Sequence, residues 1–364
     1  MDRRPGRGRV KFIVLVMMIL AGAAGPAFGV TTFPIKRGGP EDLNRVIAVG
    51  DIMLAGSAVP VLKINGISYP FRSSGLAKLI STSDAAFANL EYPITMRQDR
   101  FMDKTYLFKG LPQTLAAIKE AGFTLVSLAN NHIMDYGSQG LMDTIEQCDR
   151  IGLAHAGAGA DDASAGKPAV FVRRGVRYGL LAYSLTFPPE FWAKKDRAGT
   201  YHPHYTQIQN DIQKARPGAD ILMVSFHWGE ELSSTPKPYQ EALAHLAVDA
   251  GADMVIGHHP HVAQAIEIYQ GKPIFYSLGN FVFGSYSTKV DTGFMAELAY
   301  RGLRLQEVNL YPLIVCNHTT LFQPKLAEGP VARKIIKNLY RISKKYNTGI
   351  MLTNNCGKVV IPVQ

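Results

Sequence analysis

Five apolar stretches of this chain each lead into polar groups of the kind that bind metal ions, and this pattern restricts the folds available to it. The apolar stretches have the length and composition of buried β-strands, and helical segments separate several of them. Alternation of this kind favours mixed sheets flanked by helices, that is, a layered α/β (α+β) sandwich. The polar groups that follow the strands are Asp51, Glu91, Asn131 with His132, His227, and the histidines of His258-His259-Pro260-His261.

The expected secondary structure follows from the spacing of apolar residues and from turn and capping signals. Residues 169–172 and 178–183 flank an Arg-Gly turn and predict a β-hairpin. Pro112 and Gly122 bracket a predicted helix, with proline in its first turn and glycine after its end. Strands are predicted at 45–49, 85–90, 124–128, 220–226 and 253–256, helices at 75–83, 112–121, 137–151, 207–215 and 239–250, and further β structure at 262–269, 272–276, 293–300 and 303–311.

Each polar group also has an ordinary explanation. Asp51 follows a glycine and suits a turn, Glu91 suits a solvated loop, and His227 beside a tryptophan suits a packed core. Five such strand ends in one chain instead indicate a shared metal site. Carboxylate, amide and imidazole ligands suit borderline divalent ions such as Mn²⁺, Fe²⁺ or Zn²⁺. A pair of such ions about 3.5 to 4 Å apart is a common device for hydrolysis, and a carboxylate is able to bridge them.

These motifs resemble the CapA family of capsule and poly-γ-glutamate synthesis proteins, whose fold is similar to that of the calcineurin-like metallophosphatases. The resemblance covers about residues 45–300, in the family's order. It rests on the segments VGDIML (49–54), NLEYP (89–93), FKGLP (108–112), SLANNHIMDYG (127–137), HWGEE (227–231), GADMVIGHHPHVAQ (251–264) and YSLGNFVFG (276–284).

The resemblance implies a role for each residue that matches the family's motifs. It makes His132 the histidine that assists the leaving group, and it leaves His258 outside the metal shell. From spacing, Asp135 is expected to hold the tautomer of His132. Lys109 is expected either to face the cleft and pair with substrate or to be a solvated loop residue, and Asn280 to contribute a polar wall. The implied metal ligands are Asp51, Glu91, Asn131, His227, His259 and His261.

The chain departs from the phosphatase pattern at two positions. Met53 stands where those enzymes usually have a histidine, and a thioether is a poor ligand for hard or borderline ions. Glu91 is one methylene longer than the usual aspartate. We therefore expect one of the two metal positions to be weak or empty.

Residues 1–29 have a basic start, a short apolar run and small residues near Ala27, which predicts a cleaved signal peptide or an uncleaved N-terminal anchor. We expect an exported protein, periplasmic or otherwise extracytoplasmic. Residues 44–318 are expected to form the metallophosphatase-like domain and 329–364 a C-terminal extension of helix and strand. Cys148 is expected inside a helix, while Cys316 and Cys356 are able to pair or to stay free.

The charge of the chain argues against a nucleic-acid partner. Its formal charge is +10, and without residues 1–29 it falls to about +6, a mild excess that favours an anionic substrate or polymer. The basic segment 334–345 reads as an amphipathic helix with a solvated face. Three functions remain open: phosphoester hydrolysis in capsule or poly-γ-glutamate biosynthesis or export, a non-catalytic polymer-binding accessory role, and hydrolysis of γ-glutamyl amides. A membrane-bound capsule synthesis complex is the expected partner.

Overall fold

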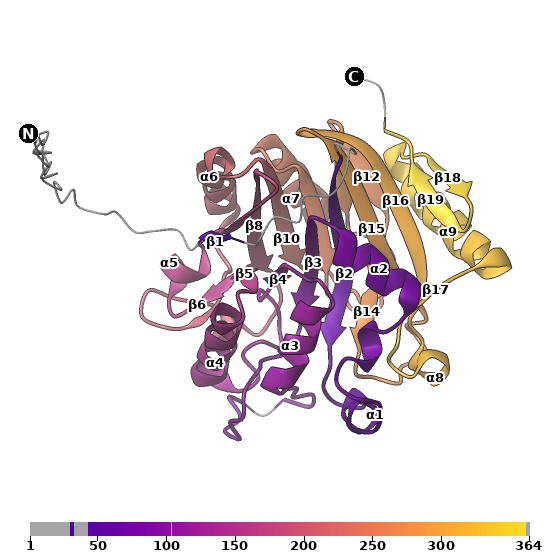
Figure 1. The fold of residues 1–364 in the computed structure, drawn as a ribbon. Helices are drawn as coiled ribbons and strands as arrows, with labels where there is room; N and C mark the ends of the chain where they lie inside the picture. Colours follow the sequence, from indigo (N-terminus) through magenta and orange to yellow (C-terminus); the bar gives the residue numbers. More distant parts are fainter. Residues whose placement is uncertain (1–29, 33–42, 103, 362–364) are drawn as a thin grey trace, which may run out of the picture.

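Two mixed β-sheets lie face to face at the centre of the molecule, and helices cover their outer faces (Figure 1). The structure, a computed structural model, describes residues 30–32, 43–102 and 104–361. The predicted signal segment 1–29 lies outside these ranges. The predicted fold class, a layered α/β sandwich with mixed sheets flanked by helices, is confirmed.

The first sheet has seven strands, and its central strands run parallel. The predicted hairpin is present, because β7 and β8 pair antiparallel around a turn in which Arg174 and Gly175 have positive φ. β8, β10 and β11 then pair in parallel, so their carboxyl ends meet at one edge. The strand order is β1 (Val30–Thr32), β7 (Ala169–Arg173), β8 (Val176–Ser184), β10 (Ile221–His227), β11 (Met254–His258), β13 (Lys272–Phe275) and β12 (Ile266–Tyr269).

The second sheet has ten strands and is built around β2. β2 pairs in parallel with β3 and β14 and antiparallel with β15. The main order is β18 (Ile350–Thr353), β19 (Cys356–Val359), β16 (Arg304–Ile314), β15 (Thr292–Arg301), β2 (Leu43–Met53), β3 (Ala85–Leu90), β4 (Leu125–Ser127) and β5 (Ala154–Ala156), with β14 (Asn280–Phe283) on β2 and β17 (Lys325–Leu326) on β16. A small sheet pairs β6 (Ala158–Gly159) with β9 (Gly199–Thr200).

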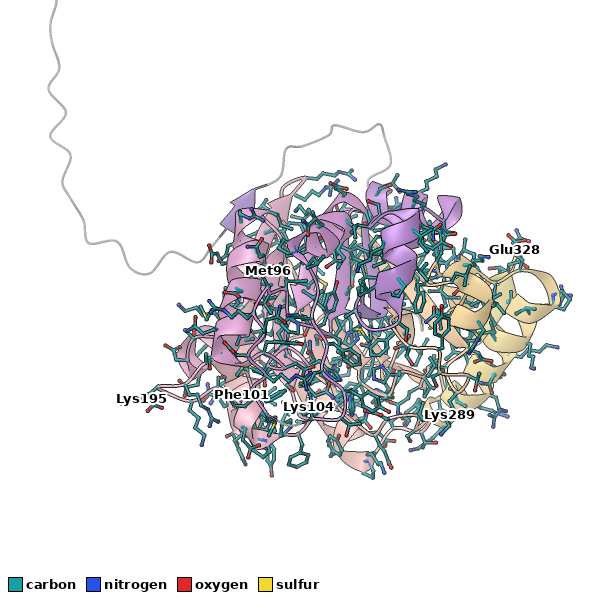
Figure 2. All side chains as sticks on the ribbon, turned by 90° about the horizontal axis from the view of Figure 1, so that it is seen from below. Met96, Phe101, Lys104, Lys195, Lys289 and Glu328 are labelled. Atoms are coloured by element: carbon teal, nitrogen blue, oxygen red, sulfur yellow. The ribbon has the colours of Figure 1, made fainter. Side chains whose placement is uncertain are left out.

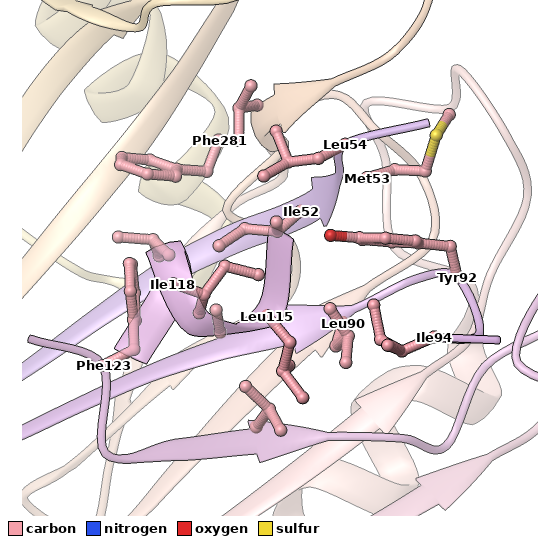
Figure 3. Close-up of a cluster of buried hydrophobic side chains, with 14 of the residues drawn as sticks. Ile52, Met53, Leu54, Leu90, Tyr92, Ile94, Leu115, Ile118, Phe123 and Phe281 are labelled. Atoms are coloured by element: carbon pink, nitrogen blue, oxygen red, sulfur yellow. The ribbon is translucent and has the colours of Figure 1, made fainter. Parts of the chain in front are cut away.

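Alternate residues of each strand enter different cores. On β2, Val46 and Ala48 face the core between the sheets, whereas Ile47 and Val49 face the helical layer. The core on that helical side includes Leu115 and Ile118 of α3 (Figure 3). The helices of this side are α1 (Ala58–Asn65), α2 (Ser74–Thr82), α3 (Pro112–Glu120) and α4 (Gly137–Arg150), while α6 (Tyr205–Ala215) and α7 (Pro238–Asp249) cover the first sheet.

The C-terminal residues are integrated into the sandwich. Ile335, Ile336 and Leu339 of α9 (Gly329–Ser343) join the core between the sheets, and β19 pairs with β16. The remaining short elements are α5 (Asp162–Ala165), α8 (Asn317–Thr320) and the 3₁₀ turns η1 (Tyr69–Phe71), η2 (Pro189–Phe191), η3 (Arg216–Gly218) and η4 (Lys344–Tyr346). Cys148 is buried in α4, as expected, and Cys316 and Cys356 are free. Within the described ranges, no helix is long and apolar enough to cross a membrane.

Candidate metal centre

The polar strand ends of both sheets meet at one edge of the sandwich. Asp51 lies on β2 and Glu91 directly after β3, both in the second sheet. His227 ends β10, and the histidine loop follows β11, both in the first sheet. The structure thus brings together residues that the sequence separates by more than two hundred positions. Ligands commonly bind beyond the carboxyl ends of strands in this way.

Two buried carboxylates form the floor of the site. Asp51 and Glu91 are both fully buried. The side-chain amide of Asn89 donates to Oδ1 of Asp51 at 2.9 Å and to Oε2 of Glu91 at 3.1 Å. Of the other two carboxylate oxygens, both buried, Oε1 of Glu91 accepts no hydrogen bond from the described part of the chain, and Oδ2 of Asp51 has Nδ1 of His261 at 3.1 Å. Such buried, unsatisfied oxygens are costly unless a cation or water completes them.

Two clusters of three buried ligand groups share Glu91. One cluster is Glu91, His227 and His259, and the other is Asp51, Glu91 and His261; within each, the candidate ligand atoms lie within 4.8 Å of one another. Oδ1 of Asn131 lies 2.9 Å from Nε2 of His227, beside the first cluster. Carboxylates and imidazoles in this arrangement fit Mn, Fe or Zn ions, with Glu91 as the group common to both positions.

The histidine loop has a strained backbone. His259 and His261 have φ of 93° and 60°, in the left-handed region that non-glycine residues rarely adopt. The loop is tied at two points, since Leu232 N donates to Pro260 O and Asn280 N to His261 O. Strain of this kind costs of order 1–3 kcal/mol per residue and gathers at functional sites. Here it directs both imidazoles toward the carboxylates.

Burial and contacts between the groups of the site shift their pKa values in different directions. Burial alone would raise the pKa of Asp51, but hydrogen bonds with His258 and His261 hold this pKa well below its usual range. Burial and the nearby charge of Asp51 raise the pKa of Glu91 well above its usual range. Burial and His261 lower the pKa of His259 to about 3, so this imidazole is neutral and able to act as a ligand.

His132 and its partners form a second group beside the carboxylates. Nδ1 of His132 lies 2.8 Å from Oδ2 of Asp135, and Nζ of Lys104 lies 2.6 Å from Oδ1 of the same carboxylate. Lys104 also donates to the carbonyl oxygen of Asn131 at 2.8 Å. Burial lowers the pKa of His132, and Asp135 partly offsets this. The imidazole is thereby fixed in orientation through Nδ1.

A cavity of about 240 Å³ opens next to these groups, and its lining includes His132, His261 and Asn280. Oδ1 of Asn280 lies 2.9 Å from Nδ1 of His261. Lys109, expected from the sequence either to face the cleft or to be a solvated loop residue, does not line this cavity. Its ammonium donates to the carbonyl of Arg97 and to the side chain of Gln98. The lysine that contacts the residues of the site is Lys104, which was not predicted from the sequence.

Met53 packs in the hydrophobic layer beneath the site. Its side chain is fully buried, and Figure 3 shows it among Leu54 and Tyr92. Among the histidine, cysteine, aspartate and glutamate side chains of the described chain, Glu91 and His261 complete the group that contains Asp51.

Four residues near the centre were not assigned to it from the sequence. Asn89 bridges the carboxylates, and Nδ1 of His258 lies 2.9 Å from Oδ1 of Asp51. Glu231 forms a more exposed cluster with His259 and His261, and Lys104 contacts Asp135. Asn89 and Glu231 fall inside motifs that already stood out, NLEYP and HWGEE, so the same segments held the signal. Nothing local distinguishes Lys104 from Lys109.

Comparison with known proteins gives a consistent picture. The family model described as bacterial capsule synthesis protein PGA_cap matches residues 45–285. A protein of Bacillus anthracis named capsule biosynthesis protein CapA is 32% identical, and the alignment covers 95% of this chain and 84% of that protein. The PGA biosynthesis protein CapA of Bacillus subtilis is 34% identical, over 74% of this chain and 70% of that protein.

Two further proteins match a smaller part of this chain or match it at lower identity. A probable polyglutamine synthesis accessory protein of Mycobacterium tuberculosis is 37% identical over 57% of this chain and 58% of that protein. Among solved structures, a putative 5′-nucleotidase of Staphylococcus aureus has a TM-score of 0.46 and 17% identity, covering 75% of this chain and 54% of that one. A structural similarity of this size carries no argument about activity.

Proposed function

The chain belongs to the family of bacterial capsule synthesis proteins, and from this premise we propose that it is a metal-dependent phosphoester hydrolase of capsule or poly-γ-glutamate biosynthesis or export. The relatives from Bacillus anthracis and Bacillus subtilis are named for these processes. The sequence expectation of an exported protein is part of the proposal, and so is a membrane-bound synthesis complex as its partner.

One observation carries the hydrolase proposal. Two buried clusters, Glu91–His227–His259 and Asp51–Glu91–His261, share a carboxylate and adjoin a cavity lined by His132. Divalent ions bound there would supply Lewis-acid activation of water and of a substrate oxygen. The ligand set would be these five residues with Asn131, as predicted from the sequence.

The other residues of the site act on the substrate side. His132, held through Nδ1 by Asp135, presents its Nε2 for proton transfer to the leaving oxygen. Lys104 keeps positive charge beside that histidine and favours an anionic substrate. Asn280 orients His261 and adds an amide to the cavity wall.

A non-catalytic polymer-binding role is the second candidate, and Met53 is the observation that favours it. Its thioether takes the place of a histidine ligand, so the position beside Asp51 has fewer ligands than a full two-metal centre. Hydrolysis of γ-glutamyl amides is a third candidate that would use the same residues.

Metal content and turnover of the purified chain separate these candidates. We expect stoichiometric Mn, Fe or Zn, hydrolysis of an aryl phosphate, and loss of that hydrolysis in His132→Ala with metal content retained. Polymer binding without turnover of either phosphoester or polymer would support the accessory role, and release of glutamate from polymer would support the amidase. Absence of bound metal after anaerobic, metal-replete preparation contradicts the metal centre itself.

A further inference from the structure

A second cavity adjoins the metal-site cavity along one wall. Three chain segments line the first cavity with one residue and the second with a residue one or two positions further on: Leu232 and Ser234, His261 and Val262, and Val290 and Asp291. The two cavities are thus separated only by the thickness of these segments.

The second cavity, of about 400 Å³, is a groove between α9 and the segments around residues 262 and 292. Val331, Ile335 and Leu339 give it an apolar wall on the side of α9. Ser234 and Thr292 on the opposite side add hydroxyl groups. Such a mixture suits a ligand that alternates methylene groups with polar groups.

Positive charge follows the groove along α9. Lys334 and Asn338 both line the groove. The guanidinium of Arg341 donates a hydrogen bond to Oδ1 of Asn338 at 2.9 Å. Positions 334, 338 and 341 lie on one face of the helix. Both cations are exposed, and neither forms an ion pair with any residue in the described ranges. The segment Gly329–Ser343 contains no acidic residue.

One carboxylate opposes this charge, because Asp291 lines the end of the groove next to the metal-site cavity. The exposed side chains of Arg333 and Lys337 extend the positive charge around α9. The net charge of the helix face therefore exceeds that of the single aspartate. In the view from below, Lys289 and Glu328 both lie to the right of Lys104, on the side of the molecule that carries α9 (Figure 2).

We propose that this groove, lined by Lys334 and Asn338 of α9 and by Val262 and Thr292 and flanked by Arg341, binds an extended polycarboxylate chain of γ-linked glutamate and leads it to the metal-site cavity. The proposal rests on the proposed function, since it takes the polymer as ligand. Each γ-glutamyl unit offers methylenes to the apolar wall, an amide to the hydroxyl groups, and a carboxylate to Lys334 or Arg341.

The test compares the full chain with Lys334→Gln/Arg341→Gln, by fluorescence anisotropy of end-labelled poly-γ-glutamate in the presence of Mn²⁺. We expect at least threefold weaker binding and a shallower dependence on salt, since exposed charge contacts are screened. Lys194→Gln/Lys195→Gln is the control. It removes two exposed charges from a loop that lies far from α9 in Figure 2, and we expect unchanged affinity.

Several outcomes would overturn the groove. The first is an α9 variant that binds the polymer as tightly as the parent chain, and the second is an equal loss of affinity in the control variant. The third is a parent chain that does not bind the polymer. The fourth is an α9 variant that loses binding to phosphatidylglycerol vesicles but still binds the polymer. The fourth outcome would identify the basic face of α9 as a membrane-facing surface. Both variants should keep the unfolding midpoint of the parent chain, because the substituted side chains are exposed.

Failure of the groove and failure of the hydrolase are distinguishable. Polymer binding that depends on α9, in a chain without aryl phosphate turnover, removes the hydrolase alone. If aryl phosphate turnover is observed but polymer affinity is the same in the parent chain and in the α9 variant, only the proposed groove is contradicted.

Discussion

Asp135 is the residue that connects the substrate-side groups of the site to one another. Its carboxylate is fully buried and contacts His132, Lys104 and the backbone N–H of Phe108. An amide in its place cannot accept from all of these donors, and it leaves the Lys104 ammonium without its carboxylate.

We therefore expect Asp135→Asn to reduce aryl phosphate hydrolysis by about 10²-fold, within the range typical of general acid catalysis. Metal content should remain, because Asp135 belongs to neither ligand cluster. Steady-state kinetics with metal analysis on the same samples checks both. Full activity in this variant would remove His132 orientation from the mechanism.

Met53 gives a second prediction at this scale. Because its side chain is fully buried in a hydrophobic layer, we interpret it as a packing residue. Met53→Leu conserves volume and should cost less than about 1.5 kcal/mol of stability. We expect the number of bound metal ions to be the same as in the parent chain. A loss of metal with an intact fold would instead identify the thioether as a ligand.

At the scale of elements, the pairing of β2 with β14 sets the position of Asp51 against Asn280. Gly50 makes this pairing close: a Cβ there would lie 1.7 Å from the carbonyl oxygen of Gly279, which is itself bonded to the N–H of Asp51. A backbone atom cannot yield as a flexible side chain does.

Gly50→Ala should therefore force β14 away from β2, lower the unfolding midpoint strongly, and reduce metal binding. The cost is expected to reach or exceed the roughly 1–3 kcal/mol of ordinary overpacking. Gly218→Ala is the matched control, since a Cβ there would meet no atom within 4 Å. Thermal unfolding of both variants checks the prediction, and similar midpoints would contradict it.

The start of β10 is fixed to β8 by an ion pair that predicts a pH dependence. Arg177 donates two side-chain hydrogen bonds and one backbone hydrogen bond to Asp220. The hydrogen bond from Arg177 lowers the pKa of Asp220 in the folded state. Its stabilisation is thus present above the unfolded pKa of about 3.9 and is lost as pH falls through the lower folded value.

Asp220→Asn should accordingly lower the urea midpoint at pH 7, by a modest amount because the pair is partly exposed. The difference from the parent chain should shrink by pH 3. A difference that is the same at both pH values would show that charge is not its origin.

These elements also show why part of the structure could be predicted from the sequence. Strands such as β10 and β11 are continuous apolar runs, and their polar ends are local signals. The pairing of β2 with β14 is not local, because β14 comes more than two hundred residues later. The choice of Lys104 over Lys109 is set by Asp135, which fixes the intervening loop through the N–H of Phe108. No spacing within the loop contains that information.

At the scale of the whole molecule, the candidate centre joins the two sheets. Asp51 and Glu91 come from one sheet, and His227, His259 and His261 come from the end of the other. Ions bound by both sets would cross-link the layers on either side of the central core. Divalent ions would also satisfy the buried Oε1 of Glu91, which accepts no hydrogen bond within the described part of the chain.

Metal binding should therefore raise the stability of the entire sandwich and not only that of the loop. An ion present at 100 times its dissociation constant stabilises the folded state by about 2.7 kcal/mol, which corresponds to a rise of several degrees in the unfolding midpoint. We expect this rise when Mn²⁺ is added to chelator-treated protein, as measured by calorimetry. His259→Ala should reduce it, because this residue belongs to two of the three ligand clusters, whereas the exposed Lys195→Gln should not. If His259→Ala responds to Mn²⁺ as the parent chain does, the stabilising ion binds elsewhere and the centre does not join the sheets.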